Sequence, residues 1–379
     1  MKNIYLDNAA TTPIDEQVMD LMIKVMRDCY GNPSSTHSSG QEAKALIEEV
    51  RRKIAAYLRV QPGEIIFTSC GTESNNLIIK SCVEHLGVER IITSPMEHKC
   101  VAESVRDMKN RKGIEAVYIR PNSKGDITLD QVEQALKSSD RKTLVTLMHA
   151  NNEIGNIYDI SSIGKLCRRY GAYFHSDTVQ TIGHLDVDFS KTEIDFASCS
   201  AHKFHGPKGV GFAFVRKTSK LKCMISGGGQ ERDLRSGTEN VPGIVGLGKA
   251  LEISLENKDD YQSHTQEIKD YAITRLKEEI IGIKFNGWTS KEKSLYTLLS
   301  ILLPFKDPMI GFKLDMKGIA VSQGSACSSG ATKPSAVMLM LLDEEEMNNS
   351  TPLRVSFSHR TKKKDIDAFV EALVSVQPI

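Results

Sequence analysis

One lysine of this chain stands where a reactive amine is expected. Lys203 follows a short apolar run, residues 194–199, and hydroxyl, imidazole and glycine side chains surround it in residues 200–206. The run predicts a buried strand, and open α/β sheets bind ligands at the carboxyl ends of their strands. Lysine amines form Schiff bases with carbonyl compounds. A lysine alone is more often a plain surface residue, so this prediction depends on its companions.

Two further segments match the needs of a phosphorylated, nitrogen-containing carbonyl cofactor. Gly71 and Thr72 stand between an apolar run and a helical stretch, and backbone N–H groups at a helix N-terminus bind anions. Asp177 follows the apolar run 172–175, where a carboxylate can keep a pyridine nitrogen protonated, and Gln180 can bond a phenolic oxygen. Each residue alone is more often a turn or a helix cap. Together with Lys203 they predict pyridoxal 5′-phosphate (PLP).

Three more polar residues fit the same site. His98 follows another strand-like run and is suited to stacking on a ring and moving protons near neutral pH, although a lone histidine is more often structural. Asn152 again follows a strand and can reach a cofactor or a carboxylate. Arg354 stands in the apolar run 352–357, where a buried charge needs either a substrate carboxylate or a structural salt bridge. The residues that end separate strands should converge on one crevice.

A second reactive centre is predicted at Cys327. It stands among small residues, at 322–330, whereas most other cysteines of the chain have apolar neighbours. Glycines on both sides suit a loop that carries its thiol into a cationic site, where the thiolate is favoured. The alternative is an ordinary exposed thiol.

The elements that must position these residues predict an α/β fold. Seven short apolar runs alternate with helical stretches, at 65–68, 90–93, 116–119, 144–147, 172–175, 196–198 and 210–214. This order indicates a large, mainly parallel seven-stranded sheet with helices on both faces. An amphipathic helix is predicted over 41–60 with Ser38 and Ser39 as caps, and a long helical region over 243–279.

The C-terminal part of the chain has a different pattern of apolar runs. Strand-like runs at 296–303 and 353–357 stand among further helices and indicate a smaller α+β domain. We expect a large domain at 15–255. A small domain formed by 1–14 and 256–379 would carry the cysteine loop at about 320–333.

Composition narrows the class of protein. The 49 basic and 48 acidic residues of this 379-residue chain leave a net charge of +1, which gives no reason to expect nucleic acid or an anionic membrane as the main partner. The eight cysteines form no CxxC pair, so neither a disulfide framework nor a metal site is predicted. No run approaches the length of a signal peptide or a membrane span. We expect a cytoplasmic protein with a small substrate.

With these residues assembled, the chain resembles the cysteine desulfurases, fold-type I PLP enzymes of the class-V aminotransferase family, across nearly its whole length. The motifs that carry the resemblance occur in the family's order, at 5–13, 32–37, 69–76, 97–98, 151–153, 175–180, 200–203 and 235–238. Residues 324–329, Gly-Ser-Ala-Cys-Ser-Ser, are similar to the active-cysteine loop of the group with a long mobile segment. Cys70 and His359 depart from the family, which usually has glycine at both places.

The resemblance implies a homodimer that removes sulfur from L-cysteine and releases L-alanine. Cys327 would hold the sulfur as a persulfide and pass it to an acceptor protein of unknown identity, for iron-sulfur cluster assembly or for thio-cofactor and tRNA thiolation. Lys203 would carry PLP and remove the substrate's α-proton, while Asn152 and Arg354 hold its carboxylate. The implied cofactor ligands are Gly71, Thr72, His98, Asn152, Asp177, Gln180, Ser200, His202, Lys203 and Thr238 of the partner subunit.

Three other functions stay open at this point. A class-V aminotransferase or a β-eliminating lyase would share the PLP site but would have no use for Cys327 on a loop. A non-catalytic PLP-binding or sulfur-relay protein would not require the full set of catalytic groups. Selenocysteine lyase activity would use the same site.

Overall fold

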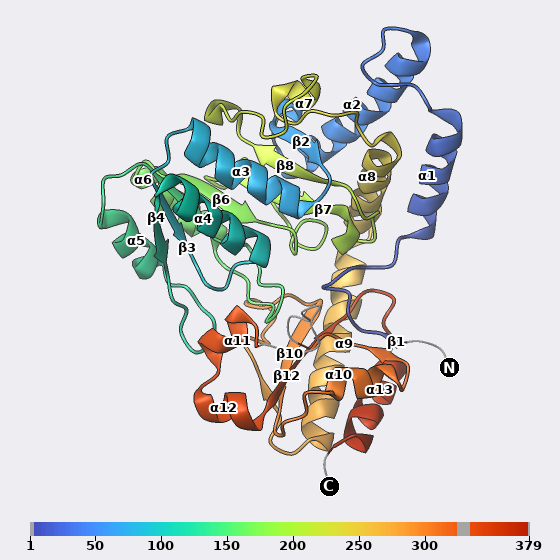
Figure 1. Cartoon of the computed structure of the whole chain (residues 1–379). Helices are drawn as coiled ribbons and strands as arrows, with labels where there is room; N and C mark the ends of the chain where they lie inside the picture. The colour runs from blue at the N-terminus through green and yellow to red at the C-terminus, as the bar shows by residue number, and fades with distance from the viewer. Residues whose placement is uncertain (1–3, 324–333, 378–379) are drawn as a thin grey trace.

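The computed structural model describes residues 4–323 and 334–377 of the chain (Figure 1). The described residues form a seven-stranded sheet, a three-stranded sheet and a two-stranded pair. Figure 1 shows the large sheet and its helices in the upper part of the molecule and the three-stranded sheet in the lower part. The long helix α9 (Lys258–Glu279) runs down beside the three-stranded sheet.

The large sheet has the strand order β2-β8-β7-β6-β5-β3-β4. Strand β8 is antiparallel to both of its neighbours, β2 and β7, while every other neighbouring pair is parallel. The strands are β2 (Ile65–Thr68), β3 (Arg90–Thr93), β4 (Glu115–Tyr118), β5 (Thr143–Thr146), β6 (Tyr173–Asp177), β7 (Phe196–Ser200) and β8 (Gly211–Val215). The predicted large, mainly parallel seven-stranded sheet is therefore confirmed.

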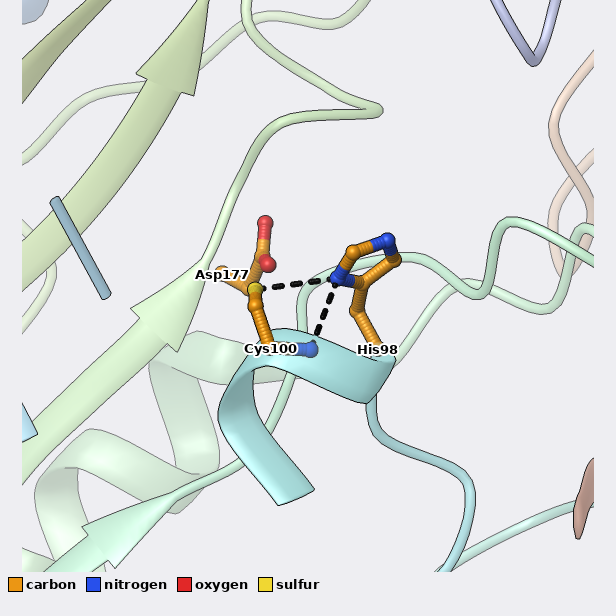
Figure 2. A group of neighbouring side chains, drawn as sticks. All are labelled: His98, Cys100 and Asp177. Atoms are coloured by element: carbon orange, nitrogen blue, oxygen red, sulfur yellow. Dashed lines mark hydrogen bonds between the residues drawn. The ribbon is translucent and has the colours of Figure 1, made fainter. Parts of the chain in front are cut away.

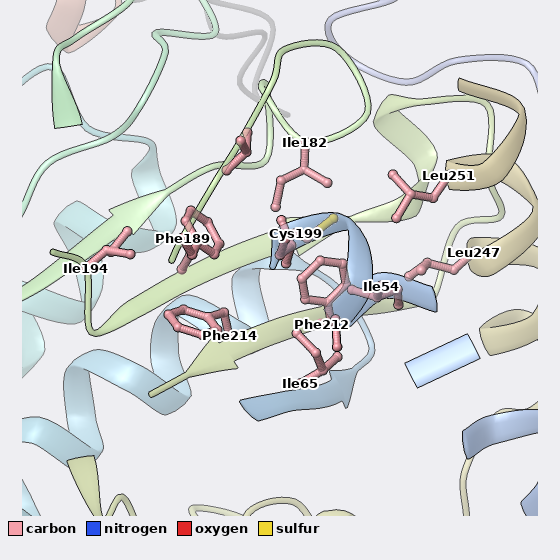
Figure 3. Packing of buried hydrophobic residues seen from close by; sticks show 14 of the residues in the cluster. Ile54, Ile65, Ile182, Phe189, Ile194, Cys199, Phe212, Phe214, Leu247 and Leu251 are labelled. Carbon is pink, nitrogen blue, oxygen red and sulfur yellow. The ribbon is translucent and has the colours of Figure 1, made fainter. Parts of the chain in front are cut away.

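Successive residues of the strands bury their side chains on opposite faces of the large sheet. In β2, Ile65 packs into one buried cluster and Ile66 into another. In β8, Phe212 belongs with Ile65, and Ala213 belongs with Ile66. Figure 3 shows the first cluster, in which Phe212 lies with side chains from α2 and α8. Because side chains alternate along a strand and helices cover both faces, these strands read as continuous apolar runs.

Helices cover both faces of the large sheet. One face packs against α2 (Ser38–Leu58) and α8 (Val241–Glu256), and the other packs against α3 (Gly71–His85) and α4 (Lys99–Lys112). Around these lie α1 (Glu16–Asp28), α5 (Leu129–Lys137), α6 (Ile160–Arg169) and α7 (Gln230–Asp233).

One detail of the predicted helices was wrong, and another is refined. The N-cap of α2 is His37, whose ring nitrogen accepts the N–H of Gly40, so Ser38 and Ser39 lie inside the helix. The region 243–279 is helical, as predicted, and consists of two helices, because α8 ends before Asn257 and α9 begins after it. A histidine cap and a one-residue break leave the apolar spacing unchanged, so the spacing could not reveal them.

The lower part of the molecule has its own core. Strands β9 (Lys284–Phe285), β10 (Leu298–Leu303) and β12 (Thr351–Ser356) form an antiparallel sheet whose apolar residues pack against α9, α10 (Ile310–Asp315) and α13 (Lys363–Ser375). Strand β1 (Ile4–Tyr5) pairs in parallel with β11 (Ile319–Ala320). The short helices α11 (Ala336–Leu341) and α12 (Glu344–Asn349) precede β12. The division into domains at residues 15 and 256 stays a prediction.

The helices of the described residues include none that is both long enough and apolar enough to cross a membrane.

The buried cluster of Figure 3 gives a test of the fold. Replacing Phe212, which is fully buried, with alanine should lower the free energy of unfolding by about 3–5 kcal/mol, because the ring is lost and a cavity remains. The matched control is Phe312→Ala on α10. The Phe312 side chain is 58% exposed, so its loss should change the free energy of unfolding by less than about 0.5 kcal/mol. Urea unfolding followed by fluorescence would measure both. Equal losses in the two variants would contradict this packing.

Candidate active site

One cavity of about 470 Å³ opens at the carboxyl ends of the parallel strands. It is lined by residues that follow β2, β3, β5, β6 and β7, and by Arg354 of β12. The predicted site residues that line it are Gly71, Thr72, His98, Asn152, Asp177, Gln180, Ser200, His202, Lys203 and Arg354. The structure thus brings these side chains together, as expected for polar groups that end neighbouring strands.

Two predicted residues are not part of this lining. Thr238 is exposed in the connection between α7 and α8. Its contact with the phosphate of a partner subunit stays a prediction. Cys327 lies outside the described residues. Arg235, close to Thr238 in sequence, pairs through Nε with Glu73 of its own chain at 2.8 Å.

The start of α3 forms an anion cradle at one end of the cavity. Cys70, the residue before the helix, caps it with no side-chain hydrogen bond. Backbone N–H groups of the first turn are therefore left to bind an anion, and the helix dipole favours negative charge there. A Cβ atom at Gly71 would lie 2.6 Å from Cγ2 of Val179, so only glycine fits this close approach. Ser200 and His202 line the cavity with this turn.

His202 is suited to donate a hydrogen bond rather than a positive charge. Burial, together with the charges of Lys203 and Lys208, lowers the pKa of His202 to about 4, so the ring is neutral at pH 7. One of its nitrogens, Nδ1, lies 3.1 Å from the hydroxyl of Thr11. The other remains to bind a ligand.

Asp177 is held rigidly at the end of β6. Its Oδ2 accepts a hydrogen bond from Nδ2 of Asn75 at 2.7 Å, and its Oδ1 accepts the N–H of Val179 at 3.0 Å. The side chain is buried, so its orientation is fixed by these donors. Gln180 donates through Nε2 to the carbonyl oxygen of Ala9 at 3.1 Å.

Lys203 projects from the short turn after β7 toward the N-terminal segment. Its Nζ donates to the carbonyl oxygens of Ala9 at 2.8 Å and Ala10 at 2.7 Å. Burial is the main cause that lowers the pKa of this amine, to about 8, and the positive charge of Arg354 lowers it further. An amine with this pKa is partly neutral near pH 7 and can act as a nucleophile or a base.

Arg354 forms one of the two contacts that were open for it, and the substrate carboxylate stays a prediction. It forms the structural salt bridge, through NH2 to Asp7 at 2.8 Å, and its NH1 donates to the backbone oxygen of Asn152 at 2.9 Å. Its Nε, however, is buried and has no partner among the described residues. A buried guanidinium with a donor to spare is a ready site for a carboxylate.

Figure 2 shows a close group formed by His98, Cys100 and Asp177. The ligand atoms of these three residues all lie within 4.8 Å of one another, which is compact enough for a metal ion. Hydrogen bonds already account for the arrangement, because Nδ1 of His98 accepts the N–H of Cys100 and both oxygens of Asp177 accept donors. We therefore assign no metal to the group.

Comparisons with known proteins agree with this geometry. The sequence profile of the class-V aminotransferases matches residues 4–369. The chain belongs to that family.

Among its relatives is a protein of Dictyoglomus turgidum named "Cysteine desulfurase IscS", which is 38% identical over 98% of this chain and 94% of its own length. A solved structure titled "NIFS-LIKE PROTEIN" superposes with a TM-score of 0.89, at 36% identity and with 99% of both chains covered. A third structure, titled "SspA in complex with cysteine", has a TM-score of 0.79 at 32% identity, over 93% of this chain and 98% of that one.

The residues of the cavity fit PLP, the cofactor of this class of enzymes. The uncapped helix start with its required glycine suits the phosphate, the fixed carboxylate of Asp177 suits the protonated ring nitrogen, and the buried amine of Lys203 suits the aldehyde. These three groups line one cavity.

Sequence reasoning missed several residues of the site. Asn75, Glu97 and Cys100 line the cavity, yet none was predicted to act there. Asn75 stands one helical turn after Gly71 on α3, a spacing that does place it on the same face. Glu97 accepts the N–H of Met148, and burial raises its pKa well above the usual range. Its position next to His98 in the sequence could have indicated that Glu97 also lines the cavity.

The lowered pKa of Lys203 predicts how attachment of PLP to the apoenzyme depends on pH. The neutral amine is the nucleophile, so the rate should rise about tenfold per pH unit below about 8 and level off above it. Rapid mixing followed by borohydride trapping would measure the rate. Lys203→Arg is the control and should trap nothing. A rate that does not change between pH 6 and 9 would contradict this environment for the amine.

Proposed function

We propose that this protein is a cysteine desulfurase that uses PLP to take the sulfur atom from L-cysteine. The observation that carries the proposal is the shared cavity of Lys203, which can hold a carbonyl cofactor, and Arg354, which can hold an α-carboxylate. This pair fits an amino-acid substrate. The names of the relatives support cysteine as that amino acid, because one is called a cysteine desulfurase and another structure is titled as a complex with cysteine.

In this proposal the chain's polar groups orient the substrate. The guanidinium of Arg354 binds the α-carboxylate, and the side chain of Asn152, which lines the same cavity, adds a second contact. The salt bridge with Asp7 keeps the guanidinium in place before the substrate arrives. A carboxylate held in this way fixes the direction of the bonds at the α-carbon.

Two groups hold and move protons. Nζ of Lys203 removes the α-proton, which suits an amine whose pKa burial has lowered to about 8. His98 lines the same cavity from the end of a different strand and holds a proton at a ring nitrogen. Asp177 would hold the ring nitrogen of the cofactor, Gln180 its phenolic oxygen, and the turn at Gly71 and Thr72 its phosphate. PLP, when bound, supplies the electron sink that stabilises negative charge at the α-carbon.

Cys327 is the proposed sulfur acceptor on the enzyme. Its thiolate attacks the sulfur of the substrate, an S–S bond forms, and the C–S bond breaks with its electron pair going to the β-carbon, which gains a proton. Lys203 returns the proton that it removed to the α-carbon. The products are L-alanine and a persulfide on Cys327, so atoms and electrons balance without a further oxidant or reductant. The persulfide then passes its outer sulfur to a thiol of an acceptor protein.

The same proposal includes the setting of the enzyme. The active form is a homodimer in which Thr238 of the partner subunit joins the phosphate site, and the protein acts in the cytoplasm. Relatives named IscS support a sulfur supply for iron-sulfur clusters. Thio-cofactor and tRNA thiolation are the other uses of such sulfur.

A cysteine variant tests the proposed reaction. The purified holoenzyme should form alanine and a persulfide from L-cysteine, and Cys327→Ser should retain PLP absorbance but lose at least about 100-fold in alanine release, because the thiolate that attacks sulfur is absent. Alanine assay and mass spectrometry of the labelled persulfide would measure both. The control is Cys29→Ser, at a half-buried thiol at the end of α1, which should keep full activity. A fully active Cys327→Ser enzyme would favour the aminotransferase or lyase alternatives.

A second variant tests the carboxylate site. Arg354→Gln should raise KM for L-cysteine about 10- to 100-fold, because a charge-assisted bond to the carboxylate is lost. Cysteamine, which lacks the carboxylate, serves as the control substrate, and its weak turnover should change by less than about threefold. If the variant lost both activities equally, Arg354 would have only the structural role that its bond to Asp7 provides.

A further inference from the structure

The position of His98 at the start of a helix fixes which of its ring nitrogens carries the proton. His98 is the N-cap of α4, and its Nδ1 accepts the backbone N–H of Cys100 at 3.2 Å. A ring nitrogen that accepts an N–H has no proton of its own. The neutral imidazole therefore carries its proton on Nε2, which Figure 2 shows on the side of the ring away from Cys100.

The side chain of Cys100 reinforces this arrangement. Its Sγ lies 2.9 Å from Nδ1 of His98. Burial, with a smaller contribution from the negative charge of Asp177, raises the pKa of the Cys100 thiol to about 12, so the group is an S–H at neutral pH. An S–H beside a bare ring nitrogen donates to it.

The sulfur also connects His98 with the carboxylate of Asp177. Nδ2 of Asn75 has two hydrogens and lies 2.7 Å from Oδ2 of Asp177 and 3.2 Å from Sγ of Cys100. Asn75 thus donates to the carboxylate and to the sulfur, and the sulfur donates to His98. All four residues line the cavity. The donors run outward from Asn75, to Asp177 on one side and through Cys100 to His98 on the other. A proton on Nδ1 of His98 would therefore leave the S–H of Cys100 without its acceptor.

We propose that Cys100 is a positioning residue for His98. It keeps the imidazole of His98 in the tautomer that presents an Nε2–H donor to the cavity. This inference rests on the proposed function only for what the Nε2–H group does in the reaction. The tautomer itself does not depend on any turnover. A donor at Nε2 stabilises an electron-rich group of the bound substrate or cofactor, whereas the opposite tautomer would offer a lone pair there. It also means that Cys100 has a role other than that of a second sulfur carrier.

The test measures the tautomer directly. Holoenzyme labelled with ¹⁵N-histidine would be examined by NMR, with His98→Gln to assign the signals of the two ring nitrogens. The wild type should show Nε2 protonated and Nδ1 bare. In Cys100→Ala the backbone N–H remains, but the second donor is lost, so the Nδ1 signal should shift and broaden. Cys100→Ser, which keeps a donor of similar size, should move back toward the wild type.

Kinetics give a second readout. Cys100→Ala should lower kcat for L-cysteine about 3- to 10-fold and change KM less than about twofold, because a group that orients a catalytic side chain acts after the substrate has bound. Cys100→Ser should recover to within about twofold of the wild type. Melting temperature and PLP absorbance would verify that all variants are folded and loaded.

Several results would overturn the proposal. These are a proton on Nδ1 in the wild type, an unchanged spectrum and kcat in Cys100→Ala, or a Cys100→Ser variant no better than Cys100→Ala. The last result would mean that the volume of the side chain, and not its donor, is what matters. If the wild type has the Nε2–H tautomer but releases no alanine from L-cysteine, the proposed function fails while this inference stands.

Discussion

The site depends on the hydrogen bonds that tie the N-terminal segment, residues 6–12, to both sheets. On one side, the N–H of Ala9 donates to Oγ of Ser356 at 2.8 Å, and Asn8 donates to the oxygen of the same residue on β12. On the other side, the carbonyls of Ala9 and Ala10 accept the amine of Lys203 after β7. An unpaired amine would be costly at this depth. The segment therefore provides the reactive group with polar partners and closes one wall of the cavity.

Electrostatics in this enclosed space set the chemistry of each group. Lys203 and Arg354 share one cavity, and the charge of Arg354 adds to burial in lowering the pKa of Lys203, while Asp177 and Asp7 partly oppose that effect. The result is an amine that loses its proton easily in the same cavity as a guanidinium. A cofactor aldehyde requires such an amine and a substrate carboxylate requires such a cation, and burial is the main cause of the first.

The sequence allowed the sheet and most of the cavity to be predicted, because both depend on local patterns. Apolar runs revealed the seven strands, and the ends of β2, β3, β5, β6 and β7 marked polar residues of the cavity. The order and direction of the strands were not predictable in this way. Both depend on which segments pair, as the antiparallel pairing of β8 with β2 and β7 shows. Asn75 and Cys100 were also missed, because spacing within one helix gives the face of a residue but not its hydrogen bonds to other elements, here between α3, α4 and β6. Arg354 was predicted only in part. Its charge in an apolar run indicated a partner, but not whether that partner was a substrate carboxylate or a residue in a structural salt bridge.

The reversal of β8 has a consequence for how the reactive lysine moves. Because β7 ends and β8 begins at the same edge of the sheet, the ten residues between them form a closed loop, pinned where the N–H of Ala201 donates to the oxygen of Val210 at 3.1 Å. Within it the N–H of Gly206 donates to Ala201, and a Cβ on that glycine would lie 2.8 Å from the Cβ of Ala201. The backbone has little freedom to follow a ligand. Any travel of the amine between cofactor and substrate must come from rotation about the bonds of its own four-carbon stem.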